Sequence, residues 1–243
     1  MDVTFVINKF TCDYTVPISQ CDHNAKLSFM GIFNIFMDLA TEHAALLKVS
    51  NKDLDNCFWV AAKTRVRCAN RPEMMHRLTA STWPQEPGNI RCNRFCTLED
   101  AGGIVAEGKT EWTIIDAETC RPMKTKNIYP AELVHLEDEV CAEPFARIGT
   151  DFADCEVLKK HTVVSADIDL SKHMNNVAYI RAVMSAFTCE QIDGMNITEI
   201  EIAYRAQCFE GEELTICKRQ SEDGMDIGVI KADGTTAAVL RIK

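Results

Sequence analysis

The same order of predicted elements occurs twice along this chain of 243 residues: a strand, a long helix and a run of strands. The first set of strands is expected over residues 3–10, 58–68, 77–83, 90–98 and 104–115. The second set is expected over residues 159–164, 198–208, 213–219, 225–231 and 237–242. A repeat of this size indicates a duplicated α+β unit, in which a curved antiparallel sheet wraps a long helix.

Each predicted helix follows the first strand of its unit and begins at a residue type that caps helices well. Ser28 is the expected N-cap of the first helix, whose apolar face starts at Phe29 and which ends near Val49. Asn175 or Asn176 is the expected N-cap of the second helix. The apolar side chains of that helix recur at helical spacing, at Val177, Ile180, Val183, Met184 and Phe187.

Residues 127–155 interrupt the repeat with two prolines and an acidic cluster, and they are expected to form a surface linker. The chain is thus predicted to consist of an N-terminal unit over residues 1–126, this linker, and a C-terminal unit over residues 156–243. We expect the apolar helix face of the first unit to be plain core.

Composition excludes several classes of function. The net charge of −10 argues against a nucleic-acid partner. No apolar run approaches the roughly 20 residues of a membrane helix, and the first ten residues resemble neither a secretory signal nor a transit peptide, so the expected compartment is the cytoplasm. The twelve cysteines are scattered without zinc-site spacing, so we expect reduced thiols and neither a metal nor a cofactor.

The stretch before the second helix carries the clearest chemical signal. Asp169 and His173 lie just ahead of the predicted helix start, where free backbone amides and the helix dipole favour negative charge. We expect the amides of Asn175, Asn176 and Val177 to hold an oxyanion. Together these groups suggest acyl transfer or hydrolysis. The alternative is that Asp167 and Asp169 cap a turn and that His173 is an ordinary polar residue.

Several motifs resemble one known family. The segment from Asp167 to Ile180 is similar to the stretch before the second helix in the acyl-acyl carrier protein (acyl-ACP) thioesterases of fatty acid synthesis. Four further motifs match that family: Ala203–Cys208, Phe58–Val60, Ser81–Trp83 and Glu111-Trp112 with Thr119–Arg121. The resemblance implies a double hotdog fold and hydrolysis of fatty acyl-ACP to free fatty acid and carrier. It also implies an acyl-chain pocket in the first unit.

By this resemblance Asp169 and His173 are catalytic, with Asp169 activating water and His173 assisting or protonating the leaving thiolate. Two positions depart from the family pattern: Ser171 replaces an asparagine, and Gln207 replaces a glutamate. Glutamine can orient a water but cannot take its proton. Cys208 is an alternative nucleophile with His173 as its base. Strict strand alternation places Cys208 on the apolar face, which favours a packing role.

Lys63, Arg65 and Arg67 lie on one face of a predicted strand and would suit an acidic carrier protein or the phosphates of coenzyme A. A solvated sheet face is the alternative. Two other functions stay open, an acyl-CoA thioesterase and a non-catalytic acyl-binding hotdog protein, and a homodimer is one option for assembly. Asp22-His23-Asn24, before the first helix, looks like a degenerate copy of the catalytic stretch.

Overall fold

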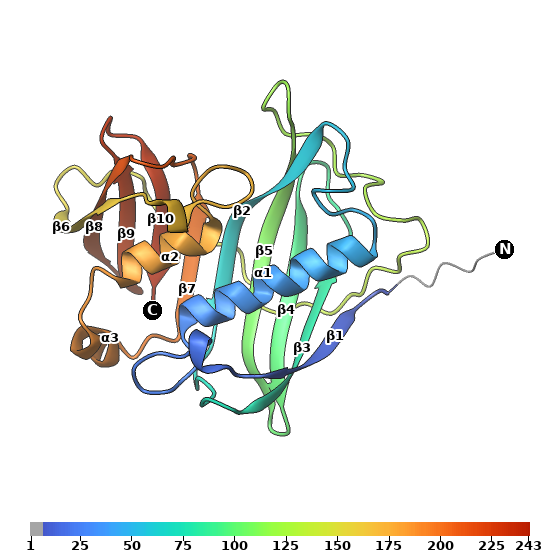
Figure 1. Cartoon of the computed structure of the whole chain (residues 1–243), viewed down its shortest axis with the longest axis horizontal. Helices are drawn as coiled ribbons and strands as arrows, with labels where there is room; N and C mark the ends of the chain where they lie inside the picture. Colours follow the sequence, from blue (N-terminus) through green and yellow to red (C-terminus); the bar gives the residue numbers. More distant parts are fainter. Residues whose placement is uncertain (1–6) are drawn as a thin grey trace. The chain divides into compact units, whose positions relative to one another are not determined.

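The first unit is a five-stranded antiparallel sheet wrapped around one long helix (Figure 1). The computed structural model describes residues 7–243, and the first compact unit ends at Glu143. Its elements are β1 (Phe10–Thr15), a 3₁₀ turn η1 (Ile18–Gln20), α1 (Phe29–Leu46), β2 (Cys57–Arg67), β3 (Arg77–Pro84), β4 (Cys92–Asp100) and β5 (Gly103–Asp116). The strands lie in the order β1-β3-β4-β5-β2.

The second unit begins at Pro144 and repeats this plan. Its elements are β6 (Glu156–Thr162), η2 (Ser165–Asp167), α2 (Asn176–Met184), α3 (Cys189–Met195), β7 (Glu199–Tyr204), β8 (Glu213–Ser221), β9 (Gly224–Lys231) and β10 (Thr236–Ile242). Read from its first strand, the order is β6-β8-β9-β10-β7, so both sets of strands follow the order first, third, fourth, fifth and second. The predicted α+β repeat, two helix-in-sheet units in tandem, is confirmed.

Helix α1 begins where predicted because the Ser28 hydroxyl accepts the Gly31 amide at 2.9 Å. Its buried face includes Phe33 and Phe36, and burying each such side chain contributes roughly 1.5–3 kcal/mol. Gly108 on β5 permits this packing, because a Cβ atom there would lie 2.5 Å from the Phe36 ring. The glycine lets the helix approach the sheet closely.

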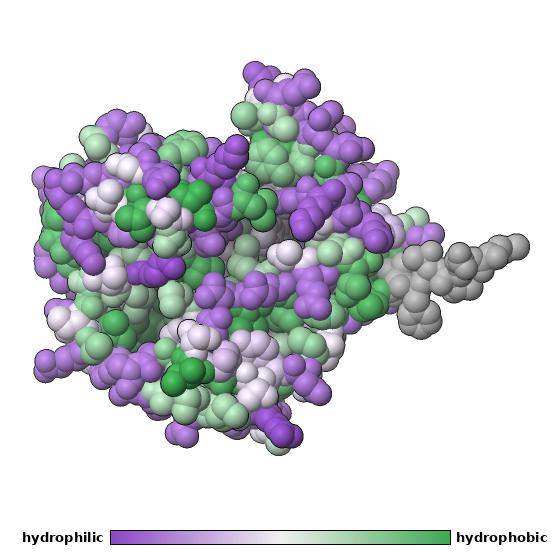
Figure 2. Space-filling view, in the orientation of Figure 1, coloured by the Kyte–Doolittle hydropathy of each residue, from purple (hydrophilic) through white to green (hydrophobic). Residues whose placement is uncertain are grey.

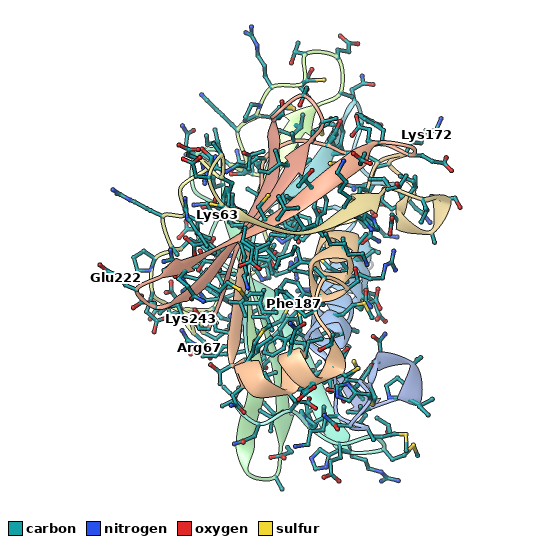
Figure 3. All side chains as sticks on the ribbon, turned by 90° about the vertical axis from the view of Figure 1, so that its left-hand side faces the viewer. Lys63, Arg67, Lys172, Phe187, Glu222 and Lys243 are labelled. Atoms are coloured by element: carbon teal, nitrogen blue, oxygen red, sulfur yellow. The ribbon has the colours of Figure 1, made fainter. Side chains whose placement is uncertain are left out.

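Helix α2 ends earlier than its apolar pattern predicts. It stops at Met184, and Phe187, labelled in Figure 3, lies in the turn before α3. The sequence reasoning missed α3. That helix has a local signal, since the Thr188 hydroxyl accepts the Gln191 amide at 3.2 Å and the Gln191 side chain accepts the Thr188 amide at 2.8 Å.

Two strand predictions need correction. The predicted strand over residues 198–208 ends at Tyr204, because the amides of Arg205 and Ala206 both donate to the Ala237 carbonyl and the ladder stops there. The alternation of the strand predicted over residues 104–115 places Ile104 on its inward face, yet Ile104 is 52% exposed. The register of β4 and β5 shifts between Leu98 and Glu99, which changes the alternation at this end of β5.

The strand predicted over residues 3–10 lies partly outside the described residues, and the observed strand begins at Phe10. Residues 127–155 contain no helix or strand, and their role as a linker stays a prediction.

On the face shown in Figure 2, hydrophilic residues are interspersed with smaller hydrophobic groups. Across residues 7–243, no helix has both the length and the apolar character needed to cross a membrane.

Candidate active site

Asp169 and His173 face each other across a tight loop between η2 and α2. The Asp169 amide donates to the His173 carbonyl at 3.2 Å, and the Lys172 amide donates to the Asp169 carbonyl at 3.0 Å. Lys172 adopts the left-handed conformation that this turn requires, with φ of 63°. Residues directly opposite in such a pair have Cβ atoms about 4.5–5.5 Å apart. The loop therefore places Asp169 and His173 at paired backbone positions.

The side chains of this loop differ in exposure. Asp169 and His173 are half-buried, whereas Ser171 is exposed and Leu170 is 83% exposed. The Asp169 Oδ1 atom accepts the Ser171 amide at 2.8 Å, which fixes the carboxylate within the loop. Figure 3 shows Lys172 at the outer margin of the structure. The candidate catalytic pair thus lies at the base of the loop and its tip reaches solvent.

The helix start after the loop supplies fewer free amides than predicted. Asn175 is the N-cap, and its Oδ1 atom accepts the amides of Val177 at 2.7 Å and Ala178 at 3.2 Å. The Asn175 amide donates to the Asp167 carbonyl at 2.8 Å. Of the three amides expected to hold an oxyanion, those of Asn175 and Val177 are therefore engaged. Within residues 7–243, the Asn176 amide is the one of the three with no recorded acceptor.

The carboxylate of Asp167, for which the sequence suggested only the alternative role of capping a turn, is buried beside the loop. Asp167 is 2% exposed and accepts hydrogen bonds from His161 Nε2 at 2.9 Å, Arg181 Nη2 at 2.5 Å and the Val164 amide at 3.0 Å. Burial alone raises its pKa, but the Val164 amide and the side chains of Arg181 and His161 hold the pKa below its usual value. Val164 is the N-cap of η2 and hence a local partner, whereas His161 comes from β6 and Arg181 from α2, so no local motif reveals those two.

Cys208 is fully buried directly beneath the loop. Its carbonyl accepts the Met174 amide at 2.7 Å. Burial raises the pKa of the thiol, and the Tyr179 hydroxyl and Lys231 offset only part of that effect. Because the thiolate is the nucleophilic form, a buried thiol with a raised pKa is a poor nucleophile. Its neighbour Gln207 is exposed, and the Gln207 carbonyl accepts Lys231 Nζ at 3.1 Å.

Among residues 7–243, the imidazole of His173 has one hydrogen-bond contact. Its Nδ1 atom lies 3.3 Å from the Met174 carbonyl. Since a carbonyl only accepts, this contact assigns the proton to Nδ1 and makes Nε2 the acceptor of the neutral ring. The ring can then exchange a proton with a reacting group through Nε2.

The first unit contains the same loop without the same chemistry. The Asp22 amide donates to the Lys26 carbonyl at 2.8 Å, and Ala25 has a φ of 56°. The Asp22 carboxylate accepts the Asn24 amide at 2.9 Å, as Asp169 does with Ser171. Asp22 thus matches Asp169, but Lys26 stands in the place of His173. The loop pair of carboxylate and imidazole occurs in the second unit.

The predicted basic strand face belongs to β2 in the first unit and is less open than expected. Arg65 is 4% exposed, and its Nη1 atom donates to the Glu143 carbonyl at 2.9 Å. Arg67 is partly exposed and donates to Glu107 at 2.9 Å. A register shift between Ala61 and Lys63 interrupts the regular alternation of β2. The three cations of the predicted basic face therefore differ in their exposure, and their role in binding a partner stays a prediction.

Comparison with solved structures shows the same fold. An acyl-ACP thioesterase from Bacteroides thetaiotaomicron superposes with a TM-score of 0.85 and 20% identity, over 97% of each chain. A 12:0-ACP thioesterase from Umbellularia californica gives a TM-score of 0.79 and 16% identity, over 97% of this chain and 96% of that one. The predicted double hotdog fold is confirmed.

Sequence relatives point the same way. The oleoyl-acyl carrier protein thioesterase 1 of Arabidopsis thaliana is 25% identical over 80% of this chain and 59% of its own length. A palmitoyl-acyl carrier protein thioesterase of Cuphea hookeriana is 22% identical over 82% of this chain and 52% of its own length. The chain thus spans little more than half the length of these relatives. Two family models match, the acyl-ACP thioesterase N-terminal domain over residues 7–133 and the C-terminal domain over residues 153–241. Since these models together cover most of its length, the chain belongs to the acyl-ACP thioesterase family.

Proposed function

We propose that this protein hydrolyses the thioester of fatty acyl-ACP, giving free fatty acid and the carrier thiol. The observation that carries the proposal is the loop in which Asp169 and His173 lie opposite each other, directly before the capped start of α2. A carboxylate and an imidazole at this spacing can activate a water and protonate a leaving group. Membership of the acyl-ACP thioesterase family supports the choice of substrate.

In the proposed mechanism, Asp169 orients a water and accepts its proton as the water attacks the thioester carbonyl. The carbonyl oxygen becomes an oxyanion, and the Asn176 amide at the positive end of α2 is the proposed donor to it. The proton taken by Asp169 then passes to Nε2 of His173, and His173 delivers it to the leaving thiolate as the C–S bond breaks. Gln207 is the proposed second group that orients the water, and Ser171 supports Asp169 through its amide.

Water is preferred to a thiol as the nucleophile. Cys208 is fully buried, and its raised pKa keeps the thiol protonated near neutral pH. A thiol mechanism would need His173 to deprotonate this buried group. The exposure of the loop, by contrast, supports direct access of water to Asp169.

The acyl chain is assigned to the first unit, residues 1–126, and the carrier protein to the cationic side chains of β2. Arg67 also lines a hollow of about 730 Å³, whose lining includes Arg71 and His76 as well as Glu73, Asp100 and Glu107. Lys63 and Arg65 stay in this assignment, although Arg65 is largely covered. Twelve free cysteines support a cytoplasmic location, and a homodimer stays an option.

The test is a thiol-release assay with acyl-ACP thioesters of several chain lengths and the matching acyl-CoA thioesters. We expect release from acyl-ACP, and a loss of 100-fold or more in kcat for Asp169→Asn and His173→Ala, in line with the roughly 10²–10⁴-fold contribution of general acid–base groups. Preference for acyl-CoA would instead support the acyl-CoA thioesterase. Tight binding of acyl-ACP without thiol release would overturn the enzyme assignment.

A further inference from the structure

The loop that carries Asp169 and His173 is held at both of its ends by one ion pair. Arg181 extends from α2, after the loop, and its Nη2 atom donates to the Asp167 carboxylate at 2.5 Å and to the Ala166 carbonyl at 2.9 Å. Both acceptors lie in η2, before the loop. We propose that Asp167 and Arg181 are positioning residues, which fix the separation of the two loop ends and thereby hold Asp169 opposite His173. This inference rests on the proposed function.

Asp167 also controls the helix start through its backbone. Its carbonyl accepts the amide of Asn175 at 2.8 Å, and Asn175 caps α2. The Asp167 side chain thus holds the body of α2 through Arg181, and the Asp167 carbonyl holds the N-cap Asn175. Because the carboxylate is buried, it stays ionised only while its donors stay in place. Arg181, whose side chain is 47% exposed, reaches it from the surface of α2.

The first unit shows that the fold does not require this charge. Gln20 stands at the position of Asp167, since its carbonyl accepts the amide of the N-cap Ser28 at 2.9 Å. The Gln20 side chain accepts Asn34 Nδ2 at 3.3 Å. Asn34 follows Ser28 by six residues, as Arg181 follows Asn175, so the neutral Gln20–Asn34 pair is the counterpart of the Asp167–Arg181 ion pair.

The charged Asp167–Arg181 pair occurs in the second unit, whose loop carries Asp169 and His173. Charged hydrogen bonds are shorter and roughly twice as strong as neutral ones, so this version restricts the loop ends more tightly. His161, on β6, adds a further donor to Asp167 at 2.9 Å. The difference between the units follows the proposed chemistry and not the needs of the sheet or helix.

The neutral Gln20–Asn34 pair of the first unit therefore suggests a substitution for the Asp167–Arg181 ion pair of the second. The double variant Asp167→Gln with Arg181→Asn installs the pair of the first unit in the second. We expect it to fold, with kcat for thiol release reduced 10-fold or more, KM changed less than 3-fold, and faster hydrogen exchange at the amides of Lys172 and Asn175. The single variant Arg181→Lys retains a cation opposite Asp167, so we expect its kcat to lie between those of the double variant and the unaltered protein. Gln20→Ala in the first unit is the matched control and should leave kcat unchanged.

Two results would overturn the inference: a wild-type kcat in the folded double variant, or unchanged exchange at these two amides. Should the double variant fail to fold, Asp167→Asn, which is nearly isosteric, serves for both measurements. Hydrogen exchange needs no turnover. Absence of thiol release in the unaltered protein, together with faster exchange in the variant, would therefore reject the proposed function while supporting the positioning role of Asp167 and Arg181.

Discussion

Arg71 forms an ion pair with Asp22, the residue of the first unit that corresponds to Asp169 of the second. The Leu27 amide donates to the Pro72 carbonyl and the Met174 amide donates to the Cys208 carbonyl, each at 2.7 Å. The residues before those two carbonyls, Arg71 and Gln207, are therefore equivalent. In the first unit the Arg71 guanidinium forms an ion pair with the Asp22 carboxylate. In the second unit the equivalent residue is the neutral Gln207. This difference leaves Asp169 able to bind a water.

Placing an arginine at position 207 should therefore inhibit the enzyme. We expect Gln207→Arg to form with Asp169 the ion pair that Arg71 forms with Asp22, and to lower kcat 10-fold or more while the protein stays folded. Steady-state thiol release and thermal unfolding measure the two effects. Arg71→Gln in the first unit is the control, with an unchanged kcat and a loss of about 1–3 kcal/mol in the free energy of unfolding. A fully active Gln207→Arg variant would contradict the proposed role of this position.

Removal of the Cys208 thiol should have little effect on the reaction. Cys208→Ala is expected to keep kcat within about 3-fold of the unaltered protein, because the buried thiol takes no part in a water mechanism. The loss of one buried sulfur should lower the free energy of unfolding by roughly 1 kcal/mol. Rapid-quench analysis for an acyl-enzyme adds a direct check. A 100-fold loss of kcat in Cys208→Ala, with an acyl group trapped on the unaltered protein, would establish the thiol mechanism instead.

The helix starts and the order of the strands along the chain were predictable, because both depend on local sequence patterns. Ser28 and Asn175 cap their helices through amides two or three residues ahead, which a sequence window contains. Likewise, the repeat fixes the class of fold, since each unit must bury one face of its helix against a sheet. The pairing of Asp169 with His173 followed from their positions in a single short stretch.

Contacts between distant elements were not predictable in this way. The end of β7 depends on the Ala237 carbonyl, which takes two amides from a segment more than 30 residues earlier. The side-chain donors to Asp167, His161 and Arg181, come from β6 and α2, and their positions reflect tertiary packing. The oxyanion site stays a prediction, and the N-cap narrows it to the Asn176 amide. A good N-cap uses the same amides that a free helix start would offer to a ligand.

The two helix caps allow stability and catalysis to be separated. Asn175→Ala and Ser28→Ala each remove a side-chain acceptor from a helix start, so each should lower the free energy of unfolding by about 1 kcal/mol. We expect only Asn175→Ala to lower kcat, because that cap adjoins the Asp169–His173 loop. Asn175→Asp keeps an acceptor and should keep the stability. Equal losses of kcat in Asn175→Ala and Ser28→Ala would show that the effect is global.

A buried imidazole in the first unit makes stability depend on pH. His43 on α1 is fully buried, with Nε2 lying 2.7 Å from the Ile7 carbonyl and Nδ1 lying 2.9 Å from Arg94 Nη1. Burial, followed by the charge of Arg94, lowers the pKa of His43 from 6.5 to about 4. Between these two values the unfolded chain binds a proton that the folded chain excludes. Acid therefore favours unfolding, and the contribution of His43 to stability is complete only above pH 6.5.

We expect the free energy of unfolding to fall as the pH decreases from 6.5 toward 4, with this one group contributing on the order of 3 kcal/mol. Glutamine can donate to the Ile7 carbonyl and accept from Arg94 but does not titrate, so His43→Gln should flatten this part of the profile. Urea unfolding of both proteins across that range isolates the effect, since all other groups are shared. Parallel profiles for the two proteins would show that the acid sensitivity arises elsewhere in the chain.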